Sequence, residues 1–206
     1  MSAGLEARGQ RPSLTIVLLI VVFVAPLIAA WVLYLTADRW GLAGGAAHGT
    51  LVQPPRALGE FRLTDAAGHA VTPATLRGRW WLVYVGGTEC DGLCGESLYK
   101  MRQLRLALGV DMRRVGRLYI MEGEAPGPSL QALIGHHPGL VVAGGPPAAV
   151  RALLDRFDLD GRDPRTAGRI YVVDPVGRLI LMYEPGAEPN GLLKDLQRLL
   201  RASRIG

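Results

Sequence analysis

The sequence predicts an α/β domain that follows a single N-terminal transmembrane helix. Residues 14–36 contain no charged side chain and are almost entirely apolar. From residue 59 onward, short apolar runs alternate with helical patterns, an alternation typical of an α/β domain. The only two cysteines, Cys90 and Cys94, directly follow one of these apolar runs. The chemistry of the domain is therefore expected where that run ends.

The run at 14–36 is longer than the about 20 residues that a helix needs to cross a bilayer. Pro26 lies in its middle, and membrane helices tolerate such a kink. A cleaved signal peptide is the competing interpretation, but its apolar core is normally only about 7–15 residues long. Arg8 and Arg11 precede the run and Arg39 follows it, so the positive-inside rule favours a cytoplasmic N-terminus.

These signals predict a single-pass protein of the bacterial inner membrane with its soluble domain in the periplasm. The expected organisation is a cytoplasmic N-terminus at 1–13, the membrane helix at 14–36, a linker at 37–58 and the domain at 59–206. The linker is assigned because residues 41–58 are rich in Gly, Ala and Pro.

The net charge of +5 over 206 residues comes from arginine, since Lys100 and Lys194 are the only lysines. A pI near 9.6 is compatible with nucleic-acid binding. The sequence shows no clustered basic stripe, no aromatic-rich binding motif and no zinc-ligand spacing. We therefore expect a solvated, Arg-rich surface and no nucleic-acid partner.

The first half of the domain begins with a strand at 59–65, a Gly-containing turn at 66–70 and a return from Val71. The run WWLVYVGG at 80–87 is continuously apolar and bounded by glycines, as a buried central strand should be. The cysteines follow, and then a helix at 97–108. One face of that helix carries Leu98, Met101, Leu104 and Leu108.

The second half alternates strands and helices in the same way. Its predicted elements are a strand at 115–121, a break at 123–128, a helix capped by Ser129, a strand at 139–145, a helix at 146–157, a hairpin of 169–174 with 178–184, and a final helix capped by Asn190. This order predicts a thioredoxin-like fold, with the cysteines at a helix N-terminus. The helix dipole favours an anionic thiolate there.

The segment GGTECDGLCGESL at 86–98 resembles the Sco/SenC family of cytochrome oxidase assembly proteins. In that family a central strand leads into a Thr-x-Cys-Pro-x-x-Cys-Pro motif. Thr88, Cys90 and Cys94 match the motif, and Leu98 also falls in place. Further matches span about residues 59–200, namely Phe61, Leu63, Thr64, Asp65, Gly68, Val71, Leu76, Gly78, the LVYVG run and IYVVDPVGRLI at 170–180. The resemblance implies a role in cytochrome c oxidase biogenesis, with an oxidase subunit or another copper or thiol client as partner.

The sequence departs from the family at three points. Asp91 and Gly95 stand where the motif has prolines, and MEGEAPGP replaces an acidic stretch. The position of the family's copper-ligating His is Thr166, and no His follows His137. Soft thiolates select Cu(I), so the two cysteines alone can still hold Cu(I) in a linear site. Stable Cu(II) binding, which the family achieves with that imidazole, is not expected.

Three interpretations of the cysteine pair stay open. The first is thiol–disulfide exchange on a client, with Cys90 and Cys94 as catalytic residues. The second is Cu(I) carriage, with the same two residues as metal ligands and no other cofactor. The third is a structural disulfide in a non-catalytic assembly factor. For exchange we expect Cys90 to be the nucleophile and Cys94 the resolving thiol.

Nearby charged and metal-ligating side chains affect these interpretations. Glu89, Asp91 and Glu96 surround the cysteines, and their charge opposes thiolate formation and favours a bound cation. His136 and His137 are adjacent and form a conceivable substitute metal site, although a surface turn is the commoner place for such a pair.

Overall fold

The computed structural model describes residues 14–36 and 47–203, which belong to two compact units, 1–46 and 47–206. In the first unit, helix α1 (Leu14–Thr36) has the bounds of the predicted membrane helix and contains Pro26. Its side chains are described for residues 18–32. In the described part of the chain, no helix combines the length and the hydropathy that a membrane crossing requires. The predicted N-terminus at 1–13 lies outside the described residues.

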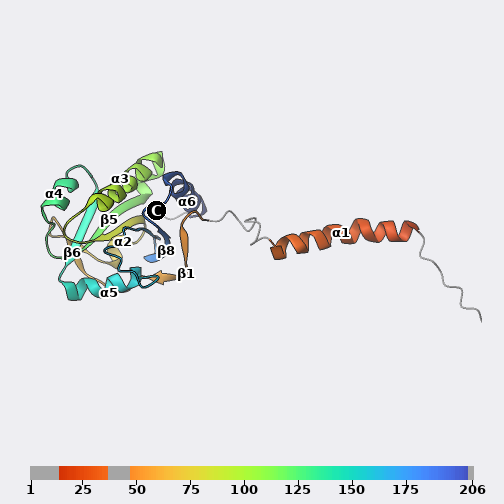
Figure 1. Ribbon diagram of the computed structural model, residues 1–206, viewed down its shortest axis with the longest axis horizontal. Coiled ribbons are helices and arrows are strands. Elements are labelled where there is room, and N and C mark those ends of the chain that lie inside the picture. The colour runs from red at the N-terminus through yellow and green to blue at the C-terminus, as the bar shows by residue number, and fades with distance from the viewer. Residues whose placement is uncertain (1–13, 37–46, 204–206) are drawn as a thin grey trace, which may run out of the picture. The chain divides into compact units, whose positions relative to one another are not determined.

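The second unit is built on one eight-stranded sheet (Figure 1). Along the sheet the strands follow the order β1-β8-β7-β4-β5-β6-β2-β3. Strand β4 pairs in parallel with β5, and β5 with β6, whereas the other pairs are antiparallel. The strands are β1 (Thr50–Ala57), β2 (Leu63–Asp65), β3 (Ala70–Val71), β4 (Trp80–Gly86), β5 (Val115–Glu122), β6 (Leu140–Gly145), β7 (Ile170–Val173) and β8 (Arg178–Tyr183).

Helices cover both faces of the sheet. They are α2 (Pro73–Leu76), α3 (Gly92–Ala107), the 3-10 turn η1 (Gly109–Arg114), α4 (Pro128–Ile134), α5 (Pro147–Phe157) and α6 (Pro189–Ala202). Helices α3, α4 and α6 lie on one face, and α5 lies on the other (Figure 1). The sandwich creates two hydrophobic cores, one on each side of the sheet.

Strand β4 is the central strand that the sequence predicts. Trp80, Leu82 and Tyr84 point into the core beneath α3 and α6. The alternate residues, such as Trp81 and Val83, point into the core beneath α5. Every residue of β4 is buried, because both faces are covered. This explains why its sequence is apolar throughout rather than alternating.

Strand β1 differs from the prediction, because it lies inside the range 37–58 that was assigned as a linker. It pairs antiparallel with β8, buries Val52, and contains a cis peptide bond between Gln53 and Pro54. An edge strand tolerates proline, since one of its sides needs no ladder hydrogen bonds. The compact unit therefore begins at Ala47 rather than at residue 59.

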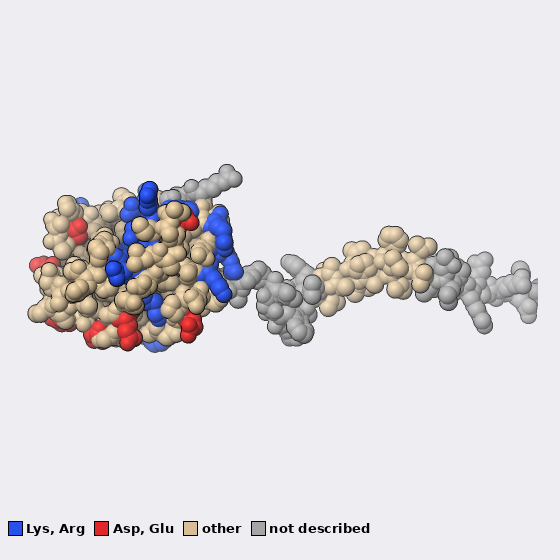
Figure 2. Space-filling model, turned by 90° about the horizontal axis from the view of Figure 1, so that it is seen from above, with Lys and Arg blue, Asp and Glu red and all other residues tan. Residues whose placement is uncertain are grey.

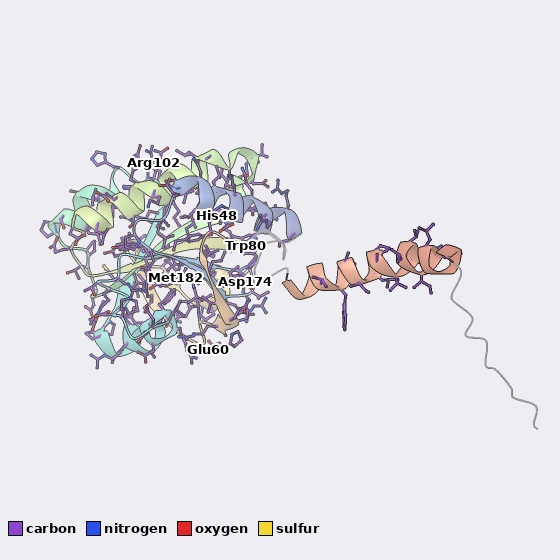
Figure 3. All side chains as sticks on the ribbon, turned by 45° about the vertical axis from the view of Figure 1, so that its right-hand side comes forward. His48, Glu60, Trp80, Arg102, Asp174 and Met182 are labelled. Atoms are coloured by element: carbon purple, nitrogen blue, oxygen red, sulfur yellow. A yellow bond between two sulfur atoms is a disulfide. The ribbon has the colours of Figure 1, made fainter. Side chains whose placement is uncertain are left out.

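The start of the domain is held by one buried carboxylate. Asp195 on α6 accepts hydrogen bonds from the amides of His48 and Gly49, at 2.7 and 3.2 Å. The Tyr183 hydroxyl donates to the same oxygen, Oδ2, at 3.1 Å, and the other oxygen, Oδ1, lies 3.1 Å from His48 Nδ1. His48 accordingly lies beside α6 (Figure 3). The first strand is thus tied to the last helix.

Three helix starts and one strand differ from the prediction. Helix α3 begins at Gly92 rather than at residue 97, with Asp91 as its N-cap. Helices α4 and α6 are capped by Gly127 and Glu188, so Ser129 and Asn190 lie inside them. A proline occupies the first position of both helices, where its fixed φ suits the helix. The predicted strand at 59–65 is limited to 63–65.

The positive charge of the domain is unevenly distributed in space. Figure 2 shows Lys and Arg side chains from the middle of one face to its right-hand edge, with Asp and Glu mainly at the left and lower edges.

Candidate functional site

The structure brings Cys90 and Cys94 together as a disulfide, with their Cα atoms 5.3 Å apart. Strand β4 ends at Gly86 and α3 begins at Gly92, so Cys90 lies in the connecting loop. Cys94 lies in the first turn of α3. The pair therefore sits where the central strand gives way to a helix, near the positive end of the helix dipole.

Asp91 caps the helix that carries Cys94. Its Oδ1 accepts a hydrogen bond of 2.8 Å from the Cys94 amide, which otherwise has no partner within the helix. The family motif has proline at this position, so the cap is a feature of this chain. The same carboxylate places negative charge beside the sulfurs, which opposes thiolate formation.

The cysteine loop is fastened to the start of α4. The Cys90 amide donates to Ser129 Oγ at 2.9 Å, and the Ser129 amide donates to Glu89 Oε2 at 3.0 Å. The Ser129 hydroxyl also donates to Glu89, and the Gly127 amide donates to the Thr88 carbonyl at 2.8 Å. A Cβ on Gly127 would lie 1.9 Å from Glu89 Oε1, so a side chain there would displace the Glu89 carboxylate from its present position.

The sequence alone does not predict that Ser129 and Glu89 hold the cysteine loop. Ser129 was expected to cap α4, and its contact with Cys90 crosses 39 positions of the chain. No local spacing rule reaches that far. The one available signal was the APGP break before it, which marks an irregular loop next to the cysteine-bearing edge of the sheet.

A pocket of about 140 Å³ lies beside the disulfide. Cys94 is among its lining residues, with Tyr84, Leu93, Tyr119, Arg165 and Thr166. Both cysteines are largely buried, with 7% of Cys90 and 4% of Cys94 exposed. Cys94 therefore forms part of the pocket wall, while Cys90 is slightly the more exposed of the two.

Two tyrosines form one wall of the pocket, and their ring centroids are 5.5 Å apart. Tyr119 Oη lies 3.9 Å from Cys94 Sγ and donates to the Gly87 carbonyl at 2.9 Å. Burial raises the pKa of Tyr84 to about 12, and the nearby Asp91 charge adds to this. Burial raises the pKa of Tyr119 further still, with smaller contributions from Tyr84 and Asp91. Both phenols therefore remain neutral hydrogen-bond donors at physiological pH.

The position expected for the family's copper-ligating His also lies at this pocket. Thr166 lines it, and its hydroxyl donates to the Asp163 carbonyl at 3.3 Å. Arg165 lines it too and pairs with Glu122 and with Asp163, the latter at 2.7 Å. Among the described residues, no group of three His, Cys, Asp or Glu side chains is placed to hold a metal ion. The pocket thus offers sulfur, hydroxyl groups, a guanidinium and the carboxylates of Glu89 and Asp91.

His136 and His137 are not brought to this site. The His137 side chain is buried near Arg117, whose Nη2 donates to the Pro138 carbonyl at 2.6 Å. Burial, and then the charge of Arg117, lowers the pKa of His137. Arg117 lies near the start of β5, opposite Leu82, whereas the cysteine loop follows the other end, where Gly86 faces Met121. The two histidines therefore lie toward the opposite end of the sheet.

Comparison with known proteins agrees with this geometry. The family described as "Transmembrane-like, thioredoxin-like, C-terminal domain" matches residues 80–203. The human mitochondrial protein SCO2 homolog is 36% identical over 102 residues, which are 49% of this chain and 38% of the relative. The chain thus spans well under half the length of this curated relative.

Solved structures agree as well. Copper-bound ScoI of Bradyrhizobium japonicum is 27% identical with a TM-score of 0.56, covering 68% of this chain and 97% of that one. Copper-bound yeast Sco1 is 18% identical with a TM-score of 0.62, covering 74% and 96%, and shows the shared fold. The predicted thioredoxin-like fold is therefore confirmed. The chain belongs to the family of transmembrane-like, thioredoxin-like C-terminal domains, and within the thioredoxin-like superfamily it is a Sco/SenC-like protein.

Proposed function

We propose that this protein is a membrane-anchored, periplasmic Sco-like protein that acts in cytochrome c oxidase biogenesis by thiol–disulfide exchange on a client. The observation that carries the proposal is the Cys90–Cys94 disulfide, which forms at a helix N-terminus beside a pocket with Thr166 at the family's His position. The charge-free run at 14–36 and the arginines that precede it support the anchor and its orientation.

The exchange reaction uses the two sulfurs alone. In the reduced protein, one thiolate attacks a client disulfide and forms a mixed disulfide, while the displaced client sulfur leaves as a thiolate. The second protein thiolate then attacks the first protein sulfur and releases the other client sulfur. Two electrons and two protons pass to the client, and the protein ends as the disulfide. Such a reaction keeps copper-ligand cysteines of an oxidase subunit reduced.

Cu(I) carriage is the second candidate, and the copper-bound Bradyrhizobium relative favours it. Here Cu(I) is cargo, held by the thiolates of Cys90 and Cys94 after the disulfide has been reduced. The guanidinium of Arg165 in the pocket opposes a bound cation, although its pairing with Glu122 and Asp163 offsets part of its charge. The carboxylates of Glu89 and Asp91 in the same pocket favour one. The absence of an imidazole at Thr166 removes the donor that suits Cu(II).

A structural disulfide in a non-catalytic assembly factor is the third candidate. The low exposure of both cysteines favours it, since a sealed disulfide in an exported domain often serves only stability. This interpretation predicts that the sulfurs stay inert while the protein is folded.

One anaerobic experiment separates the three candidates. The reduced full chain is mixed with a peptide that contains one disulfide, and, in parallel, Cu(I) is titrated against a chromogenic chelator. We expect one peptide disulfide to be reduced per protein, no Cu(I) binding in competition with the chelator, and no reaction from the Cys90→Ser, Cys94→Ser double variant. Tight cysteine-dependent Cu(I) binding without peptide reduction supports carriage instead. Neither reaction, with both sulfurs unmodified, supports the structural disulfide.

A further inference from the structure

We propose that the domain binds a phosphate group at a cluster of basic side chains between α3 and the turn that follows α4. This basic cluster consists of Arg102 and Arg105 on α3, Arg117 on β5, and His136 and His137 in the turn. It lies toward the opposite end of the sheet from the cysteine loop. The site is therefore separate from the exchange chemistry and does not depend on it.

Arg117 carries a charge into the core beneath α3. The alternate residues of β5, Val115 and Tyr119, belong to this core, so Arg117 points to the same side of the sheet. Its Nη2 donates to the Pro138 carbonyl at 2.6 Å, which places the guanidinium beside the turn after α4. From α3, Arg105 reaches the start of the same strand, where its Nε donates to the Val115 carbonyl at 2.7 Å. The basic cluster is thus assembled from three separate elements.

Two side chains of the basic cluster have hydrogen-bonding atoms that are not used. Within the described residues, Nε and Nη1 of Arg117 and Nδ1 of His137 have no hydrogen-bond partner. Both side chains are more than nine-tenths buried, since only 2% of Arg117 and 6% of His137 is exposed. A buried polar group without a partner costs free energy, and a buried charge without a counter-charge costs more. These atoms point to a partner that the described part of the chain does not supply.

The basic cluster also lacks a counter-charge. Among the described residues, no Asp or Glu forms an ion pair with Arg102, Arg105 or Arg117. Burial, and then the charges of Arg105 and Arg102, lowers the pKa of Arg117 to about 10. Burial, and then the charges of Arg117 and Arg102, lowers the pKa of His137. An ordered water satisfies a donor but leaves this repulsion in place, whereas an anion removes both costs.

The other fully buried arginine shows how this domain compensates such a charge. Arg169 donates to Asp160 and to Glu184, and both carboxylates lie within 2.8 Å of its Nη2. Arg117 has two arginines for neighbours in place of two carboxylates. A bound anion would give Arg117 the partner that Asp160 and Glu184 give Arg169.

A phosphate suits the unused donors better than a carboxylate does. Nε and Nη1 of Arg117 lie on different edges of the planar guanidinium and point in different directions. The tetrahedral oxygens of a phosphate can meet donors from several sides, whereas the two oxygens of a carboxylate match one edge. Arg102 is half-buried and His136 is exposed, so their side chains can move to admit the anion. Free inorganic phosphate and the phosphate of a lipid headgroup share this chemistry.

The first test uses inorganic phosphate as the probe. Urea unfolding of the full chain in mild detergent is followed at increasing phosphate, with sodium chloride added to keep the ionic strength constant. Binding to the folded state should raise the unfolding midpoint by about 0.5–1 M urea for each tenfold increase above the Kd, at typical m-values. We expect this rise in the parent, no rise in Arg117→Met, and a phosphate affinity at least about tenfold weaker in Arg102→Gln.

Two matched controls should keep the full rise. Arg169→Met removes the other buried arginine, and Arg151→Gln removes the same charge as Arg102→Gln from an exposed position on α5. Without phosphate, Arg117→Met should unfold no earlier than the parent, so a damaged fold does not explain its lack of response. Equal rises in the parent and in Arg117→Met overturn the site, because phosphate also stabilises proteins by exclusion from their surface. Sodium acetate should have no comparable effect, and an equal effect overturns the preference for phosphate.

The second test replaces free phosphate by a lipid headgroup. The same unfolding curves are recorded in detergent micelles with and without phosphatidylglycerol. A rise that Arg102→Gln weakens and Arg151→Gln keeps identifies the headgroup as a source of the phosphate, whereas a rise with inorganic phosphate alone identifies a soluble compound. No rise in either test overturns the site. Peptide reduction by Arg117→Met should equal that of the parent, so failure of the phosphate site and failure of the exchange function are distinguishable.

Discussion

Two buried arginines in this domain should respond differently to the same substitution: replacing Arg169 by Met should destabilise the fold, and replacing Arg117 by Met should not. Arg169 is fully buried and donates to Asp160, at 2.6 and 2.8 Å, and to Glu184, at 2.8 and 3.2 Å. Arg117 is only 2% exposed and donates through Nη2 to the Pro138 carbonyl. Within the described residues, its Nε and Nη1 have no hydrogen-bond partner.

The surroundings of Arg117 add to the cost of its charge. Burial lowers its pKa to about 10, and the charges of Arg105 and Arg102 lower it further in the same direction. Arg102 lies on the outer side of α3 (Figure 3), on the helix that covers this face of the sheet. The guanidinium is thus a buried cation flanked by other cations.

The expected changes in the free energy of unfolding follow from these contacts. Arg169→Met breaks charged hydrogen bonds worth about 1.5–3 kcal/mol each, but Asp160 and Glu184 are 40% and 44% exposed and can be rehydrated. We expect a loss of about 2–3 kcal/mol in the free energy of unfolding. Arg117→Met removes an uncompensated charge and keeps a side chain of similar length, so we expect no loss or a gain of about 1–2 kcal/mol.

The assay is urea unfolding of the oxidised full chain in mild detergent, followed by tryptophan fluorescence. The urea concentration at the unfolding midpoint should fall for Arg169→Met. For Arg117→Met it should stay the same or rise, and the m-values of both variants should be unchanged. Equal destabilisation by both substitutions would refute the reasoning, because it would mean that Arg117 has a stabilising partner comparable to that of Arg169.

Three further predictions concern single contacts. Burial raises the pKa of Asp195, but hydrogen bonds from His48, Gly49 and Tyr183 outweigh it and lower the pKa overall. The ionised carboxylate therefore stabilises the folded state fully above about pH 4, the pKa of an unfolded Asp. This stabilisation is lost as the pH falls through the lower pKa of Asp195 in the folded protein. Asp195→Asn should therefore cost more at pH 7 than at pH 3 in urea unfolding, and an equal cost would contradict this. Asp91→Ala should cost about 1 kcal/mol in thermal unfolding through loss of the α3 cap, and an unchanged Tm would exclude that role. Ser129→Ala should speed hydrogen exchange at the Cys90 amide about tenfold, while the Cys94 amide, held by Asp91, serves as the internal control.

The parts of the fold that local pattern determines could be predicted from the sequence. The central strand is visible because both its faces are buried, which leaves Trp80 to Val85 apolar without interruption. The helix after the cysteines is visible in Leu98, Met101 and Leu104, which all pack into one core. The thioredoxin-like order follows from these elements and the final hairpin.

The parts that depend on distant contacts could not be predicted in this way. Strand β1 was missed because Pro54 and Pro55 argue against a strand unless it is known to lie at an edge. Asp195 meets His48 across 147 positions, and no periodicity connects them. Tyr119 looked like one more apolar residue of a buried strand, and only the structure places its hydroxyl beside the Cys94 sulfur.

The reduction potential of the Cys90–Cys94 pair tests the exchange function most directly. The full chain is equilibrated in dithiol redox buffers, quenched with a thiol-trapping reagent and weighed by mass spectrometry. Exchange with a client requires a reversible two-electron couple above about −300 mV, with native structure kept in both states. A potential well below about −300 mV, or reduction only after the protein has been unfolded, would contradict the account and mark the disulfide as structural.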